Sequence, residues 1–285
     1  MPFCIIFVLL QPFLRISIDF FYVNTILMDL TVEEIEQEEP PKVIFIVPYR
    51  DRQQQYDFFA RQMAHVLEGT SYRILYIHQK DNRSFNRGAL KNIGFITVKN
   101  LYPDTYRCIT LVFNDIDTMP YTKGFFNYDT VPGVVKHFYG FTFALGGIAS
   151  MNAGDFERVN GFPNLWAWGY EDNALNQRVI KNSIRIDRTQ FYPILHKNIL
   201  HLQDGVVRDV NRSEYDTYKF LTNEGVNSIT NLQYTINDET GFVDVTGFST
   251  GRDEDLSKRT QYDMTKSKVP FKNVGRGKSV MPMFM

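Results

Sequence analysis

Two aspartates separated by one residue follow a short apolar segment of the chain. Ile109 to Phe113 predicts a buried strand, and Asp115 and Asp117 come directly after it. Side chains two residues apart lie on the same side of an extended backbone, so both carboxylates can face one cation. Carboxylate oxygens favour magnesium or manganese, and a nucleotide diphosphate commonly fills the remaining coordination positions. The spacing is also typical of helix caps or solvated loop residues, and that alternative stays open.

Two further predicted strands end in cationic and aromatic side chains. The run from Val43 to Val47 predicts one buried strand, and Arg73 to His78 predicts another. The side chains that follow these strands include Pro48, Arg50, Arg52, Phe85 and Arg87. In a parallel sheet they share an edge with the aspartates, where guanidinium groups can bind phosphate and the phenyl ring can stack on a base or ribose. A simpler interpretation pairs each surface arginine with Asp51 or Asp81.

A third segment combines aromatic rings with adjacent carboxylates. It contains Trp168, Gly169, Tyr170, Glu171 and Asp172. Sugar faces stack on indole rings, and a carboxylate beside an apolar ring can act as a base because its pKa is raised. The segment is equally typical of a buried tryptophan followed by a helix whose first turn carries acids. The two interpretations are compatible.

One histidine is a candidate metal ligand. His201 lies on an apolar segment, where an imidazole is more often a hydrogen-bonded core residue than a ligand. His196 is five residues earlier, and this spacing does not place both rings on one face of a strand. We expect His65, His78 and His137 to be structural.

Alternating strands and helices must position these side chains. Helices are predicted over residues 53–67, 86–100 and 172–181. Strands and helices in this order form one parallel sheet when the crossovers are right-handed. The stretch from Tyr139 to Asn173 is rich in glycine and aromatic residues, and we expect it to form a pocket wall. The predicted fold class is therefore α/β with a mainly parallel central sheet.

Composition limits the classes of partner. The chain has 285 residues, 44% of them apolar, and 31 basic against 32 acidic side chains. This composition can bury a sizeable core and excludes a coiled coil or wholesale disorder. A net charge of -1 gives no reason to expect nucleic acid or an anionic membrane as the main partner.

The chain divides into three predicted parts. Residues 1–41 form an N-terminal extension or a weak membrane anchor, because the apolar run from Phe3 to Leu14 is shorter than the roughly 20 residues that a span needs. Residues 42–250 form the folded domain. Residues 251–285 form a basic, flexible tail, with a docking arm as the alternative.

Five ordered segments share one resemblance. They are Ile44 to Arg52, FNRGALKNIGF at 85–95, LVFNDIDTMP at 111–120, Gly146–Gly147, and NGFPNLWAWGYEDN at 160–173. Over roughly residues 42–225 the chain resembles the β-1,4-galactosyltransferase family, glycosyltransferase family seven. The resemblance implies a GT-A nucleotide-sugar-binding fold. It also implies transfer of a sugar from a UDP-sugar to an acceptor hydroxyl with inversion, usually with manganese.

The resemblance implies roles for individual residues. The implied donor contacts are Pro48, Arg50, Arg52, Phe85, Arg87, Asp115, Asp117, Gly147 and Trp168. Asp117 and His201 resemble the family's metal ligands, and Trp168 resembles the mobile-loop tryptophan that closes over the donor. Asp172 matches the proposed base and Glu171 the acceptor-site carboxylate. The implied acceptor contacts are Trp168, Gly169, Tyr170, Glu171 and Asp172.

Departures from the family pattern concern specificity. Asn198 stands where many members have a methionine-type third metal ligand, and its harder amide oxygen predicts tolerance of magnesium beside manganese. Tyr170 and Asn173 replace a glycine and an acid, so N-acetylglucosamine is not assumed as the acceptor. Ala144 replaces a bulky residue, which makes UDP-N-acetylgalactosamine a competitor of UDP-galactose as the donor.

We therefore expect an inverting, metal-dependent hexosyltransferase that acts on a saccharide or glycoprotein acceptor. The alternatives are a catalytically silent sugar-binding domain and a nucleotidyltransferase that uses the same aspartates. Only Cys4 and Cys108 are present, so the family's luminal disulfides have no counterpart. A cytoplasmic enzyme of microbial or viral type, with weak or no membrane association, is therefore expected over one in the Golgi lumen.

Overall fold

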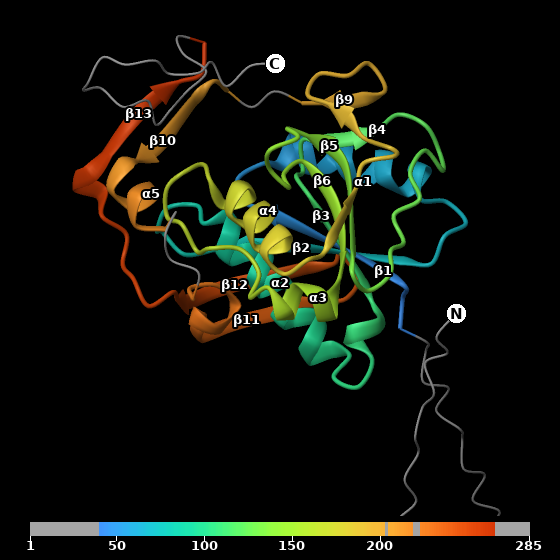
Figure 1. Cartoon of the computed structure of the whole chain (residues 1–285), viewed down its shortest axis with the longest axis horizontal. Coiled ribbons are helices and arrows are strands. Elements are labelled where there is room, and N and C mark those ends of the chain that lie inside the picture. The colour runs from blue at the N-terminus through green and yellow to red at the C-terminus, as the bar shows by residue number, and fades with distance from the viewer. Residues whose placement is uncertain (1–39, 203–204, 219–222, 266–285) are drawn as a thin grey trace, which may run out of the picture. The chain divides into compact units, whose positions relative to one another are not determined.

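The computed structural model describes residues 40–265, with gaps at 203–204 and 219–222 (Figure 1). The predicted N-terminal extension therefore lies outside the described residues except for its last two positions. The helices are α1 (Gln53–Val66), α2 (Arg87–Leu101), α3 (Ala153–Arg158), α4 (Glu171–Lys181) and α5 (Arg212–Tyr218). The first strands are β1 (Val43–Tyr49), β2 (Tyr72–Gln79), β3 (Thr110–Asn114), β4 (Thr118–Pro120), β5 (Val134–Gly140), β6 (Ile148–Asn152) and β7 (Arg185–Asp187). They are followed by β8 (Tyr192–Pro193), β9 (Ile199–His201), β10 (Val207–Asn211), β11 (Thr230–Asn237), β12 (Phe242–Ser249) and β13 (Arg259–Asp263).

The main sheet has the order β11-β12-β2-β1-β3-β6-β5-β7, with β8 beside β5. Strand β1 pairs in parallel with β2 and β3, and β12 pairs in parallel with β2. Antiparallel pairing occurs at β3 with β6, β5 with β6, and β11 with β12. The α/β fold with a mainly parallel central sheet is therefore confirmed.

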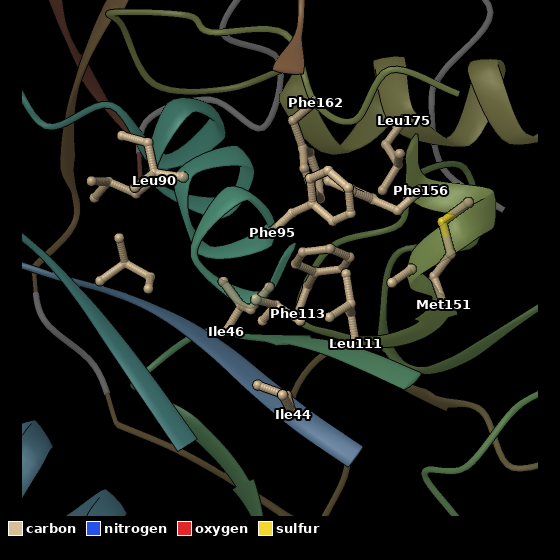
Figure 2. Close-up of a cluster of buried hydrophobic side chains, with 14 of the residues drawn as sticks. Ile44, Ile46, Leu90, Phe95, Leu111, Phe113, Met151, Phe156, Phe162 and Leu175 are labelled. Atoms are coloured by element: carbon tan, nitrogen blue, oxygen red, sulfur yellow. The ribbon is translucent and has the colours of Figure 1, made fainter. Parts of the chain in front are cut away.

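Alternate residues of β1 bury opposite faces of the sheet. Ile44 and Ile46 pack in a cluster with apolar residues of α2, α3 and α4, while Phe45 and Val47 pack in a second cluster with α1. Figure 2 shows the first cluster, in which Phe95 of α2 lies near Phe113 of β3. Both faces of β1 are covered, which explains its continuous apolar sequence.

Helix α2 approaches the sheet closely. It starts after Asn86, whose side chain accepts a hydrogen bond from the Ala89 amide. A Cβ added at Gly94 would lie 2.4 Å from a methyl carbon of Ile46, so only glycine allows this spacing between helix and strand. The close packing fixes where the first turns of α2 lie at the edge of the sheet.

The C-terminal part of the chain differs from the prediction. We expected a flexible tail from residue 251, but Arg259–Asp263 forms β13 and pairs antiparallel with β10 (Figure 1). The β11–β12 hairpin also extends the main sheet, because β12 hydrogen-bonds with β2. Backbone pairing with β10 therefore gives Arg259–Asp263 an extended conformation that composition alone did not indicate. Residues 266–285 lie outside the described part.

None of the helices within residues 40–265, gaps aside, has the length and apolar character that crossing a membrane requires.

Candidate active site

An arginine on the first turn of α2 joins carboxylates from two other elements. The Arg87 guanidinium donates to both oxygens of Asp115, at 2.6 and 2.7 Å, and also donates to Oε1 of Glu171. Asp115 follows β3 and Glu171 begins α4. Burial raises the pKa of Asp115, but the charges of Arg87 and Lys91 outweigh this effect and lower it. Strand ends and a helix start thus converge, as the sequence predicted.

The start of α4 places two acids at this edge. Gly169 and Tyr170 both have positive φ angles, +101° and +79°, and this turn puts Glu171 and Asp172 into the first helical turn. Burial raises the pKa of Glu171, against the lowering effect of Arg87. Oε2 of Glu171 is buried and has no hydrogen-bond partner among the described residues. It is therefore an available acceptor for a ligand hydroxyl.

Asp172 is enclosed by groups from α2 and from the loop between β5 and β6. Its Oδ1 accepts a hydrogen bond from the Lys91 ammonium at 3.0 Å. A Cβ added at Gly146 would lie 2.4 Å from Oδ2, and the Asp172 carbonyl accepts a hydrogen bond from the Leu145 amide. The Asp172 side chain is 18% exposed, so it can still be reached from solvent.

Asp117 and His201 meet through the two-stranded sheet of β4 and β9. Thr118 lies opposite His201 in that sheet, and the Leu202 amide donates to the Asp117 carbonyl at 2.7 Å. Burial, and then the neighbouring Asp115 carboxylate, raise the pKa of Asp117 to about 6, whereas His201 lowers it. A carboxylate repelled by a second acid and placed near an imidazole fits a divalent cation.

The third predicted metal ligand is not joined to this pair. The described contact of Asn198 is made by its backbone amide, which donates to Nδ1 of His196 at 3.3 Å. Asn198 precedes β9, so the pairing of β9 with β4 does not place its side chain. No group of three or more His, Cys, Asp or Glu side chains within residues 40–265, the gaps aside, is arranged to hold a metal. Ligation by Asn198 stays a prediction.

The predicted donor-binding side chains lie around the end of β1. The Arg50 guanidinium lies 5.4 Å from the centroid of the Phe85 ring. The Asp117 carboxylate acts electrostatically on Arg52. Pro48 is buried within β1, and Gly147, with φ +72°, accepts a hydrogen bond from the Asp115 amide at its carbonyl. Their contacts with a nucleotide stay predictions.

The segment with two tryptophans is held by the C-terminal half of the chain. The Trp168 amide donates to the Asp209 carbonyl of β10 at 2.8 Å. The Glu214 carboxylate of α5 accepts hydrogen bonds from the amides of Trp166 and Ala167. Trp166 is buried and stacks on Phe248 with 5.5 Å between ring centroids. The interpretation as a buried tryptophan therefore holds for Trp166, while Trp168 is half-buried.

Three side chains beside the predicted ones were not singled out from the sequence. Lys91 contacts Asp172, the Tyr139 hydroxyl lies 2.9 Å from Nδ1 of His201, and Glu214 holds the Trp166 amide. Lys91 lies in a helical segment that also carries Asn92 and Lys99, so no sequence signal distinguished it. His137 is structural, as predicted, because its Nε2 lies 3.1 Å from the Tyr139 and Gly146 carbonyls.

Two family models match this chain. Residues 34–127 match the N-terminal region of glycosyl transferase group 7, and residues 135–202 match the N-terminal domain of galactosyltransferase. Together they span more than half of the chain. The chain belongs to the β-1,4-galactosyltransferase family, glycosyltransferase family seven.

Curated family members are similar over part of their length. Xylosylprotein 4-beta-galactosyltransferase of Caenorhabditis elegans is 31% identical over 52% of this chain and 53% of that protein. Human beta-1,4-galactosyltransferase 1 is 29% identical over 67% of this chain and 50% of that protein. The chain thus spans about half the length of the curated relatives it matches.

Solved structures of the family share the fold. The catalytic domain of Drosophila beta-1,4-galactosyltransferase 7, in complex with xylobiose, superposes with a TM-score of 0.58 at 20% identity, covering 77% of this chain and 97% of that one. A mutant of the same enzyme in complex with manganese, UDP-Gal and xylobiose gives a TM-score of 0.55 at 18% identity, with the same coverage.

The expected localisation is wrong. We expected a cytoplasmic enzyme of microbial or viral type, but these β-1,4-galactosyltransferase relatives come from animals, namely nematode, mouse and human. We based that expectation on the small number of cysteines. This observation does not outweigh family membership.

Proposed function

We propose that this chain is an inverting, metal-dependent glycosyltransferase that moves galactose, or N-acetylgalactosamine, from a UDP-sugar to a hydroxyl of a saccharide acceptor. The observation that carries the proposal is the convergence of Asp172 and Asp115 on one pair of α2 cations, with Asp117 two residues from Asp115. A candidate base and a candidate cation site thus adjoin each other. Membership of the family supports the same chemistry.

In the proposed reaction the Asp172 carboxylate accepts the proton of the acceptor hydroxyl. The hydroxyl oxygen forms a bond to the anomeric carbon while the bond from that carbon to UDP breaks on the opposite face, so the configuration inverts. General-base assistance of this kind contributes about 10²–10⁴-fold. Arg50 and Phe85 would orient the nucleotide, and the Trp168 segment would exclude water that otherwise hydrolyses the donor.

The cation site is assigned to Asp117 and His201, with Asn198 as a third candidate ligand. When bound, manganese or magnesium would neutralise charge on the departing diphosphate. This residue pair supplies one hard oxygen and one imidazole nitrogen, a set that suits manganese.

The acceptor is proposed to bind at the start of α4. Oε2 of Glu171, which has no hydrogen-bond partner among the described residues, is suited to accept a hydrogen bond from a sugar hydroxyl. Trp168 and Tyr170 precede Glu171 in the same segment and are half-buried. A relative is named for a xylosylprotein acceptor. Xylosides therefore belong in the acceptor panel beside N-acetylglucosaminides.

The test measures UDP release and sugar transfer with manganese, UDP-galactose or UDP-N-acetylgalactosamine, and the acceptor panel. The wild type should transfer sugar and lose activity with EDTA, and Asp172→Asn should lose about 10²–10⁴-fold in turnover while still binding UDP. Asp238→Asn is a matched control, because that side chain is 78% exposed in a hairpin turn. UDP binding without transfer to any acceptor would favour a silent sugar-binding domain, and pyrophosphate release would favour a nucleotidyltransferase.

A further inference from the structure

A lysine of α2 is buried beside the proposed base. The Lys91 side chain is 2% exposed, and its ammonium lies 3.0 Å from Oδ1 of Asp172 and 4.0 Å from Oδ1 of Asp115. The centroid of the Phe162 ring is 4.6 Å from the same nitrogen. Burying an ammonium is costly unless carboxylates compensate it. The Asp172 and Asp115 carboxylates therefore compensate the buried charge of Lys91.

Helix α2 divides the carboxylates between two cations. Arg87 and Lys91 are four residues apart, so their side chains share one face of the helix. Arg87 donates to Asp115 and Glu171, and Lys91 donates to Asp172. Arg87 thus serves Asp115 and Glu171 together, and Lys91 provides the hydrogen bond from a cation to the proposed base.

The two oxygens of Asp172 have different surroundings. Oδ1 accepts the hydrogen bond from Lys91, whereas Oδ2 lies against the backbone of Gly146 and 3.6 Å from a guanidinium nitrogen of Arg87. The contact at Oδ1 fixes the rotation of the carboxylate. It leaves Oδ2 as the oxygen without a short hydrogen bond from a cation.

We propose that Lys91 is a positioning residue of the transfer reaction, whose ammonium holds the Asp172 carboxylate so that Oδ2 receives the proton of the acceptor hydroxyl. The inference rests on the proposed function, because it takes Asp172 as the base. Lys91 itself contacts no substrate in this role.

Other charged groups also act on Asp172, so each Lys91 variant must be compared with matched controls. Those that face it or act on it electrostatically are Arg87 and Lys91 from α2, Glu171 from α4, and His137 from β5, with Asp115 linked through Lys91. All of them except Lys91 stay in place in a single Lys91 variant.

The experiment compares Lys91→Met with Lys91→Arg and with Lys99→Met. Methionine keeps much of the stem without the charge, arginine keeps the charge, and Lys99 is a half-exposed lysine of the same helix that pairs with Glu157. We expect Lys91→Met to lower kcat about tenfold and to leave UDP affinity, measured by calorimetry, within about twofold. Lys91→Arg should recover part of the rate, and Lys99→Met should match the wild type.

A double-mutant cycle separates positioning from folding. In an Asp172→Asn background, adding Lys91→Met should cost no further activity, because the pair is already broken. An equal loss in both backgrounds would overturn the inference, even if Lys91→Met also lowers the melting temperature. A wild type that transfers sugar, with Lys91→Met unchanged in kcat, would overturn the inference alone. A wild type that transfers nothing would overturn the proposed function together with it.

Discussion

The phenol oxygen of Tyr139 lies 2.9 Å from Nδ1 of His201 and accepts a hydrogen bond from the Leu195 amide at 3.0 Å. Tyr139 belongs to β5 of the main sheet, and His201 belongs to β9, which pairs with β4. Engaging Nδ1 orients the ring and leaves Nε2 as the nitrogen for a cation. One hydroxyl thus links the central sheet to the proposed cation site.

Replacing this hydroxyl should weaken metal binding. We expect Tyr139→Phe to lower manganese affinity by roughly tenfold, because the imidazole loses the partner that orients it. Calorimetric titration of manganese into the protein with UDP measures the effect. The control is Tyr128→Phe, because the Tyr128 hydroxyl is buried and has no partner among the described residues. Equal affinities of the two variants would show that the hydroxyl does not orient the ligand.

A methyl group at Gly146 should displace the proposed base. The added Cβ of Gly146→Ala would lie 2.4 Å from Oδ2 of Asp172, so the carboxylate must move. Misplacement of a reacting group by about 1 Å can cost about 10²-fold, and we expect a loss of that order in sugar transfer with UDP binding retained. In the control Gly247→Ala the nearest atom would be 3.6 Å away, an ordinary contact. Full activity of Gly146→Ala would contradict the assigned position of Asp172.

His137 should make stability depend on pH. Burial, and then the Arg188 guanidinium, lower the pKa of His137 from 6.5 to about 4. Between these values the unfolded chain binds a proton that the folded chain does not, so stability is full above pH 6.5 and falls as the pH drops toward 4. The contribution is at most about 3 kcal/mol. Urea unfolding between pH 7 and 4 measures this effect. The free energy of unfolding should fall less with decreasing pH for His137→Gln than for the wild type. The exposed control His65→Gln should show the same pH dependence as the wild type. Identical slopes for all three would remove His137 as the cause.

The strands and helices that carry the site could be predicted because their local signals agree with the fold. The run from Val43 to Val47 is apolar on both faces, and the structure covers both faces. Arg87 and Asp115 were predicted to share an edge because parallel strands end there, and Arg87 donates to both oxygens of Asp115. The place of Asp172 beside them was implied by the family resemblance.

Long-range contacts could not be predicted in the same way. In α2, ten of fifteen residues are buried, so its helical periodicity gave no indication that Lys91 faces the interior. The hydroxyl of Tyr139 reaches a residue 62 positions away. Leu232, Tyr234 and Ile236 alternate with polar residues as a half-exposed strand should, but the sequence does not indicate that the hairpin joins β2.

The antiparallel pair of β10 and β13 connects Arg259–Asp263 with the segment that carries Trp168. The family match ends at residue 202, yet β10 supplies the carbonyl that receives the Trp168 amide, and β13 covers one edge of β10. Shortening the chain at residue 250 would remove β13 and leave backbone groups along that edge of β10 unpaired. A strand of another molecule could then pair with this edge. Expression boundaries and affinity tags near this end therefore bear on the proposed activity as well as on yield.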